Sequence, residues 1–208
     1  MPTIVFALVA YLIGSLSFAV ITSKLFGLRD PRTFGSRNPG ATNVLRTGKK
    51  AAAALTLLGD SAKGWLAVFL AQRFAADYGL GDAAIAAVAI AVFLGHIYPV
   101  FFSFQGGKGV ATALGILLAL DLWLGLGVLA TWIGAAAVWR ISSLSALLSA
   151  VAAPLYAWLL LGAGVTTAAV LLLAVLLLWR HKSNLQNLLA GREGRIGQNA
   201  RPQDAPPE

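Results

Sequence analysis

The chain of 208 residues is too apolar for a soluble globular domain, because 58% of its residues are hydrophobic and only 12% are charged, against roughly 45–50% and 25% in ordinary soluble domains. Its mean hydropathy of +0.77 indicates a polytopic membrane protein, and the absence of cysteine excludes disulfides, thiol nucleophiles and thiolate metal sites. The net charge of +8 suits anionic lipid headgroups or phosphorylated substrates. Nucleic acid is a poor alternative, since the basic residues are not on a soluble domain.

The first apolar run, residues 3–21, is long enough to cross a bilayer, which takes roughly 20 residues. The segment 24–50 follows and carries seven Lys or Arg against Asp30 alone. By the positive-inside rule, this segment is predicted to be cytoplasmic and the N-terminus to lie outside.

The later apolar runs complete the predicted topology. Runs 51–71 and 83–104 predict two spans. Run 110–139 would form about 45 Å of helix, too long for one crossing, and a charge near its middle is costly in lipid, so we predict two short helices that turn at Asp121. Runs 144–161 and 165–179 predict the last two spans.

The predicted fold is therefore all-α, a polytopic membrane protein of seven transmembrane helices with a cytoplasmic C-terminus. Fourteen of the sixteen Lys and Arg then lie on the cytoplasmic side, which supports the count. Residues 1–193 are predicted to form a single membrane domain. Residues 194–208, rich in proline and poor in apolar side chains, are predicted to be a disordered cytoplasmic tail.

The first polar motif is GSRNPGATNVLR, residues 35–46. Its glycines, Gly35 and Gly40, permit backbone conformations closed to other residues, and Asn38 and Asn43 offer amides. Together with a guanidinium, such a loop can present N–H groups to an anion. An ordinary connecting loop is the alternative.

The second motif is GGKGVAT, residues 106–112, directly before a predicted helix. Its glycines let a ligand approach the backbone, the helix N-terminus supplies N–H donors, and Lys108 adds a full charge. This combination favours phosphate binding, although the GxxxxGK[ST] pattern of nucleotide-binding loops is missing. The alternative is a flexible turn with an interfacial lysine.

Two further motifs lie on the same predicted side. In RISSLS, residues 140–145, Ser142 and Ser143 offer hydroxyls or cap a helix. In RHKSNLQNLLAGRE, residues 180–193, His181 and Asn184 share one helix face, although a basic run beside a span is often only a headgroup anchor.

Three ionisable residues fall inside predicted spans. Asp60 and Lys63 stand three apart, and charges at membrane depth are functional candidates, with a structural ion pair as the equal alternative. For His96 we favour a hydrogen bond between helices.

The sequence contains no serine nucleophile elbow, no HExxH and no aspartate-rich motif for magnesium-dependent transfer. Several anion-binding loops and one histidine at a membrane surface favour group transfer between phosphorylated substrates, one of them a lipid. A small anion transporter or channel is the competing class, and a non-catalytic lipid-binding protein is another. Against a transporter, the motifs gather at one face and no internal repeat is present.

Taken together, the motifs resemble those of the bacterial acyl-phosphate-dependent glycerol-3-phosphate acyltransferases, which are integral membrane enzymes. The resemblance covers nearly all of residues 10–197. It is carried by GSRNPGATNVLRTGKKAAAALTLLGDSAKG, GHIYPVFFSFQGGKGVATALG, RISSLSAL and RHKSNLQNLLAGRE.

The resemblance implies transfer of an acyl group from acyl phosphate to the 1-hydroxyl of glycerol 3-phosphate, giving lysophosphatidate and phosphate, the first step of phospholipid synthesis. It also implies the bacterial cytoplasmic (inner) membrane, a site facing the cytoplasm, no cofactor or metal, and a soluble enzyme that makes acyl phosphate as a partner. We expect direct transfer without an acyl-enzyme, because acyl phosphate is already activated and no serine has an evident His-carboxylate relay.

The resemblance, together with the motif chemistry, gives the expected site. The residues expected to act in catalysis are His181, Asn184, Lys108 and Arg46. The residues expected to bind substrate are Ser36, Asn38, Gly40, Asn43, Gly106, Gly107, Gly109, Ser142, Ser143 and Glu193.

Overall fold

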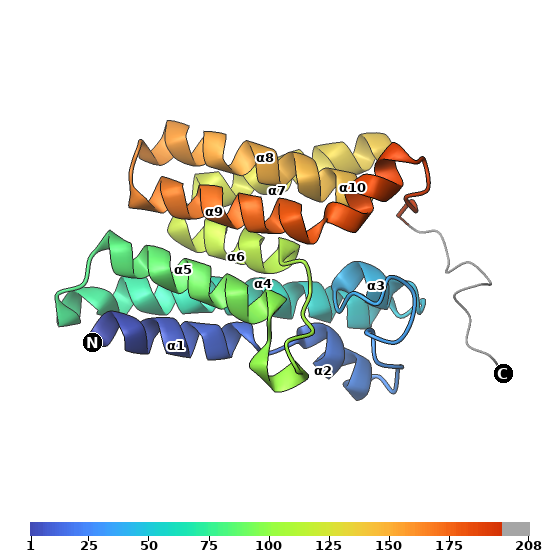
Figure 1. The fold of residues 1–208 in the computed structure, drawn as a ribbon, viewed down its shortest axis with the longest axis horizontal. Coiled ribbons are helices and arrows are strands. Elements are labelled where there is room, and N and C mark those ends of the chain that lie inside the picture. Colours follow the sequence, from blue (N-terminus) through green and yellow to red (C-terminus); the bar gives the residue numbers. More distant parts are fainter. Residues whose placement is uncertain (197–208) are drawn as a thin grey trace.

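The computed structural model describes residues 1–196 and is entirely helical over that range (Figure 1). Long helices run side by side along the longest axis, and short helices gather at one end. The α-helices are α1 (Pro2–Gly14), α2 (Phe18–Leu25), α3 (Ala41–Leu45), α4 (Lys50–Phe74), α5 (Asp82–Ile97), α6 (Val110–Leu120), α7 (Leu122–Trp139), α8 (Ser142–Leu161), α9 (Val165–Arg180) and α10 (Lys182–Leu189), with 3-10 turns η1 (Ala75–Tyr78) and η2 (Val100–Phe102).

Five helical segments of residues 1–196 are long and apolar enough to cross a membrane, and a sixth is obtained if α9 and α10, bent by 58°, count as one span. The chain is thus a multi-pass membrane protein. The predicted count of seven is not confirmed, because it needs α6 as well. At about 1.5 Å per residue, the 11 residues of α6 reach only about half of a hydrocarbon core.

The predicted turn at Asp121 is confirmed. Asp121 ends α6 and caps α7, since its carboxylate accepts a hydrogen bond of 2.8 Å from the backbone N–H of Leu124. The cap satisfies one of the free N–H groups at the start of a helix, which explains why a charged residue interrupts this apolar run.

The first predicted span is broken, because α1 ends at Gly14 and α2 begins at Phe18. The break frees the backbone carbonyl of Leu16, which accepts a hydrogen bond of 2.6 Å from Lys63 Nζ. The same ammonium lies 2.8 Å from Asp60 Oδ1. An unpaired carbonyl or charge in hydrocarbon costs several kcal/mol. These contacts therefore support the alternative in which Asp60 and Lys63 form an ion pair that stabilises the fold.

Glycines allow the long helices to cross at close range. A Cβ on Gly14 would overlap the carbonyl of Val92 in α5, and a Cβ on Gly115 would overlap the carbonyl of Ser61 in α4. Small residues at helix crossings are how membrane helices approach one another. These crossings align α1, α4, α5 and α6, and so bring their connecting loops to one end.

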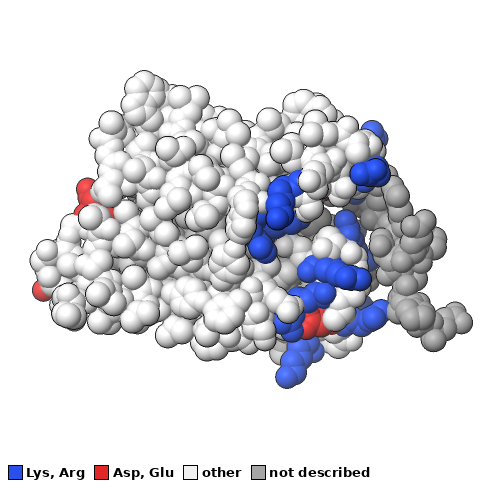
Figure 2. Space-filling view, viewed as in Figure 1, with Lys and Arg blue, Asp and Glu red and all other residues white. Residues whose placement is uncertain are grey.

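Basic side chains gather at the end of the bundle that carries α2, α3 and α10, with acidic atoms among them, and further acidic atoms appear at the opposite end (Figures 1 and 2). All four predicted polar motifs lie at the basic end.

Of the predicted tail, residues 197–208 lie outside the described residues, and Ile196 donates its N–H to the carbonyl of Arg140 over 2.7 Å.

Candidate active site

The loop between α2 and α3, residues 26–40, is held together by the side chain of Asn43. This amide, 1% exposed, donates to the carbonyls of Pro31 and Phe34 and accepts from the N–H of Ser36. A Cβ on Gly35 would lie 2.5 Å from Asn43 Oδ1, and Gly35 has a φ of +55°. The amide of Asn43 therefore shapes this loop rather than facing an open site.

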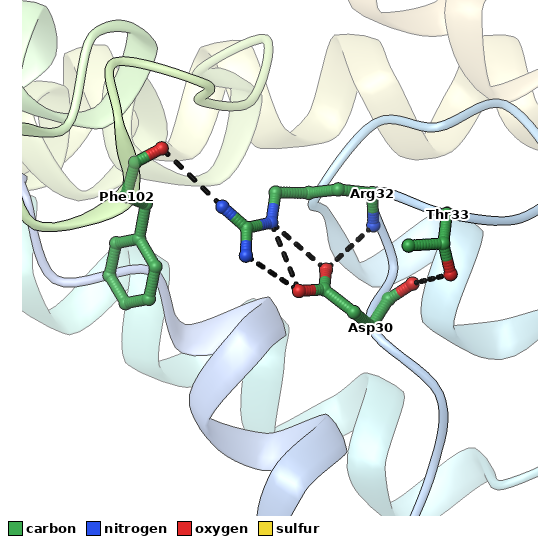
Figure 3. Close-up of polar contacts among 4 residues, drawn as sticks. All are labelled: Asp30, Arg32, Thr33 and Phe102. Carbon is green, nitrogen blue, oxygen red and sulfur yellow. Dashed lines mark hydrogen bonds and ion pairs between the residues drawn. The ribbon is translucent and has the colours of Figure 1, made fainter.

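The side chain of Arg32 joins the same loop to the segment before the GGKG motif (Figure 3). Arg32 contacts Asp30 over 2.6 Å and donates to the carbonyl of Phe102 over 3.4 Å, with its guanidinium 5.6 Å from the Phe102 ring centre. The hydrogen bond from Arg32 lowers the pKa of Asp30, and the same bond raises the pKa of Arg32. The two glycine-rich loops are thereby tied together.

The GGKG loop, residues 106–109, rests on His96. The N–H of Gly107 donates to the His96 carbonyl over 3.2 Å, and a Cβ on Gly107 would overlap His96 Nε2. Thr112 lies 3.0 Å from His96 Nδ1, and that nitrogen is 3.5 Å from Asp60 Oδ1. The interhelical hydrogen bond expected of His96 is present, and the histidine forms part of the support beneath the loop.

Lys108 begins a chain of hydrogen bonds that joins three other segments. Its ammonium donates to Asn184 Oδ1 over 2.5 Å, and the Asn184 amide donates to Glu193 Oε1 over 2.6 Å. Ser143, at the start of α8, donates to the same carboxylate oxygen over 2.7 Å. Four predicted site residues, far apart in sequence, thus meet directly.

Positive charge exceeds negative charge around Lys108. Burial lowers the pKa of Lys108 to about 8, with Glu193 opposing this shift and the nearby cations Arg180 and Arg46 adding to it. Within residues 1–196, the Arg46 guanidinium has no hydrogen-bond or ion-pair partner. A buried ammonium beside two further cations and one carboxylate is arranged to receive an anion.

His181 lies at the bend between α9 and α10 and is 3% exposed. Its Nδ1 lies 2.9 Å from the carbonyl of Leu177, so Nδ1 carries the proton and Nε2 has the lone pair. Burial, assisted by Lys108 and Arg180, lowers the pKa of His181 to about 4. The ring is therefore neutral at physiological pH.

Three of the remaining predicted site residues lie at the start of α8 and in the segment before α3. Ser142 lies 3.3 Å from the Thr42 hydroxyl, which links α8 to α3. Asn38 and Gly40 lie just before α3, where the N–H of Gly40 donates to the Asn38 carbonyl over 2.9 Å.

Among residues 1–196, no group of three or more His, Asp or Glu side chains could hold a metal ion.

Sequence reasoning missed Arg180 and Thr42. Arg180 donates from Nε to the Gly107 carbonyl over 3.1 Å and from Nη2 to the Gly106 carbonyl over 2.9 Å. In the sequence, Arg180 is the first residue of a basic run that resembles a headgroup anchor. Its contact is with a loop more than seventy residues away, and no pattern in the neighbouring sequence indicates such a contact.

The fold and the site together define a multi-pass helical membrane protein with an excess of positive charge around a buried lysine at one end of the bundle. The model of the family described as glycerol-3-phosphate acyltransferase matches residues 4–191. The glycerol-3-phosphate acyltransferase of Thiobacillus denitrificans is 63% identical over 191 residues, which cover 92% of this chain and 96% of that protein. That of Ralstonia nicotianae is 62% identical over 200 residues, covering 96% and 97%.

A solved structure agrees with these relatives. The crystal structure of PlsY (YgiH), an integral membrane glycerol 3-phosphate acyltransferase, in its glycerol 3-phosphate form superposes with a TM-score of 0.88 at 34% identity, covering 95% of this chain and 96% of that one. A lysophosphatidic acid form of the same protein superposes with a TM-score of 0.86 at 33% identity. The chain belongs to the glycerol-3-phosphate acyltransferase family.

The lowered pKa of Lys108 predicts a pH dependence of phosphate binding. The ammonium is charged below about pH 8 and neutral above it, so the affinity for inorganic phosphate should fall by up to about eightfold between pH 7.5 and 9, as the protonated fraction does. Isothermal titration calorimetry measures this affinity. Lys108→Arg should flatten the profile, because a guanidinium stays charged, whereas the control Lys182→Ala should keep it. A flat wild-type profile would remove Lys108 from the anion site.

Proposed function

We propose that this protein transfers an acyl group from acyl phosphate to the 1-hydroxyl of glycerol 3-phosphate, the first step of phospholipid synthesis. The observation that carries the proposal is the excess of positive charge around Lys108: among residues 1–196, Arg46 has no hydrogen-bond or ion-pair partner and Glu193 is the one carboxylate that opposes the effect of the cations. Membership of the glycerol-3-phosphate acyltransferase family and the likeness to a structure in a glycerol 3-phosphate form support this choice of acceptor.

The reaction forms one ester bond and breaks one acyl–phosphate bond. The hydroxyl oxygen of glycerol 3-phosphate attacks the acyl carbon, inorganic phosphate leaves, and the hydroxyl proton ends on a phosphate oxygen. Both substrates carry phosphate, so holding them together requires several cations and N–H donors in one place. Lys108, Arg46 and the two glycine-rich loops are suited to this task, with Ser36 and the glycines at 106, 107 and 109 contacting phosphate.

Direct transfer, without an acyl-enzyme, is favoured by the surroundings of the candidate nucleophiles. The hydroxyl of Ser143 donates a hydrogen bond to the Glu193 carboxylate, and the hydroxyl of Ser142 lies 3.3 Å from that of Thr42. His181 directs Nδ1 at a backbone carbonyl, so within residues 1–196 it forms no relay with a carboxylate. A serine without such a base is a weak nucleophile.

A substrate phosphate is the better proton acceptor. The imidazole of His181, with a pKa of about 4, is a weaker base than a phosphate monoester, whose second pKa is about 6. We therefore assign the proton to a phosphate oxygen, while the Nε2 lone pair of His181 accepts a hydrogen bond that orients the attacking hydroxyl.

The proposed activity is tested with purified protein in lipid bilayers, supplied with acyl phosphate and glycerol 3-phosphate. Lysophosphatidate and phosphate should form in equal amounts. Lys108→Ala and Arg46→Ala should each lower the rate by about 10²-fold or more, because substrate charge loses its partner in a partly dry site, whereas the matched control Lys182→Ala should not. No lysophosphatidate from the wild-type protein would refute the activity.

The same preparation tests direct transfer. When labelled acyl phosphate is supplied without glycerol 3-phosphate, direct transfer leaves no acyl group on the protein. Protein-bound acyl groups together with a stoichiometric burst of phosphate, both lost in Ser36→Ala, would establish an acyl-enzyme instead.

For the topology, we propose seven crossings, with the N-terminus outside and the site facing the cytoplasm of a bacterial inner membrane. Because α6 alone is shorter than the hydrocarbon core, this count requires the bilayer to thin beside α6. The basic end of the bundle (Figure 2) supports this orientation. With this orientation, a soluble enzyme can deliver acyl phosphate to the site.

In this cysteine-free chain, cysteines at Thr3 and Gly81 should react with an impermeant reagent from outside, whereas cysteines at Thr47 and Gln105 should not. The opposite labelling pattern would reverse the orientation.

A further inference from the structure

The guanidinium of Arg180, the last residue of α9, contacts the GGKG loop only through backbone carbonyls. Nε donates to the carbonyl of Gly107 and Nη2 to that of Gly106. The guanidinium carbon also lies 5.8 Å from the centre of the Tyr98 ring, which holds it in place through a cation–π contact. Arg180 therefore meets two successive peptide groups of the loop on the same side.

The planarity of the peptide bond turns these contacts into a constraint on the N–H groups. In a trans peptide the C=O and N–H point in opposite directions, and residues 1–196 contain no cis peptide. The carbonyl of Gly106 bonds to Arg180, and the N–H of the same peptide bonds to the His96 carbonyl on the other side. That peptide group is thus fixed from both ends.

The next peptide group is fixed at one end only. The carbonyl of Gly107 bonds to Arg180, so the N–H of Lys108 points away from α9. Within residues 1–196 no acceptor bonds to this N–H, nor to that of Gly109. Gly109 has a φ of +88° and starts α6, so two successive free donors precede the positive end of a helix.

We propose that Arg180 is a positioning residue, which turns the Gly107–Lys108 peptide so that the Lys108 N–H donates to the phosphate of glycerol 3-phosphate. This inference rests on the proposed function, which places that phosphate at the loop. The planar guanidinium of Arg180 donates to two carbonyls at once. The ammonium of a lysine at the same position carries the same charge but cannot form this pair of parallel hydrogen bonds.

Kinetics of Arg180→Lys and Arg180→Gln test the inference. Both variants should raise the KM for glycerol 3-phosphate by about tenfold or more, with kcat changed less than about threefold, because misdirected donors weaken phosphate binding equally in the ground and transition states. The KM for acyl phosphate should stay the same. The control Lys182→Gln removes one positive charge two residues away and should leave both KM values unchanged. A wild-type KM in Arg180→Lys would show that charge alone suffices and would overturn the inference.

Hydrogen exchange in the wild-type protein gives a test that does not depend on how the variants fold. Saturating inorganic phosphate, and separately glycerol 3-phosphate, should slow amide exchange in residues 106–109, because the free Lys108 N–H gains an acceptor. Unchanged exchange with both ligands would overturn the inference.

Failure of the inference and failure of the proposed function give different results. If phosphate protects the loop in the wild-type protein and not in Arg180→Lys, but no lysophosphatidate forms, the proposed function fails while the positioning of the loop by Arg180 stands. If the wild-type protein makes lysophosphatidate but Arg180→Lys keeps its KM, the role of Arg180 fails alone.

Discussion

The hydrogen-bonded chain from Lys108 through Asn184 and Glu193 to Ser143 is the interaction on which the rest of the site depends. It joins the loop before α6, the helix α10, the segment after α10 and the start of α8. Burial of a lysine ammonium is costly unless hydrogen-bond acceptors receive it. Asn184 supplies an acceptor while the site keeps a net positive charge, which the phosphate of the proposed substrate would neutralise.

A second set of contacts fixes the GGKG loop from below and from the side. The carbonyl of His96, in α5, accepts a hydrogen bond from the N–H of Gly107, and the guanidinium of Arg180, in α9, donates to the carbonyls of Gly106 and Gly107. His96 is in turn adjacent to the buried pair of Asp60 and Lys63. Polar groups inside the bundle thus have a structural use: they connect the break between α1 and α2 to the support beneath the loop.

Much of the architecture could be predicted because its causes are local. The costly charge at Asp121 predicted the turn between α6 and α7, and the motifs with glycine, serine and basic residues predicted the basic end of the bundle. The break near Leu16 was not predicted. Gly14, Ser15 and Ser17 interrupt the apolar run of residues 3–21, but the ammonium that bonds to the freed carbonyl comes from Lys63 in α4, far along the sequence.

The sequence could predict those parts of the candidate site that depend on residues within one motif, but not the contacts between distant segments. The prediction that Lys108 and the neighbouring glycines bind phosphate follows from residue types, whereas the contact of Arg180 with the loop depends on how α9 packs. Asn43 has a polar side chain that would suit a ligand, yet its amide is fully engaged with the loop around it. Whether Ser36, Asn38 or Gly40 contacts substrate stays a prediction.

The activity of Glu193 variants tests most directly whether the hydrogen-bonded chain assembles the site. Glu193→Ala removes the acceptor shared by Asn184 and Ser143 and should lower kcat/KM for glycerol 3-phosphate at pH 7 by about tenfold or more, the cost of stranding hydrogen-bonded groups. Glu193→Gln keeps an acceptor oxygen and should retain most of the activity. A Glu193→Ala protein with wild-type kcat/KM would contradict the account.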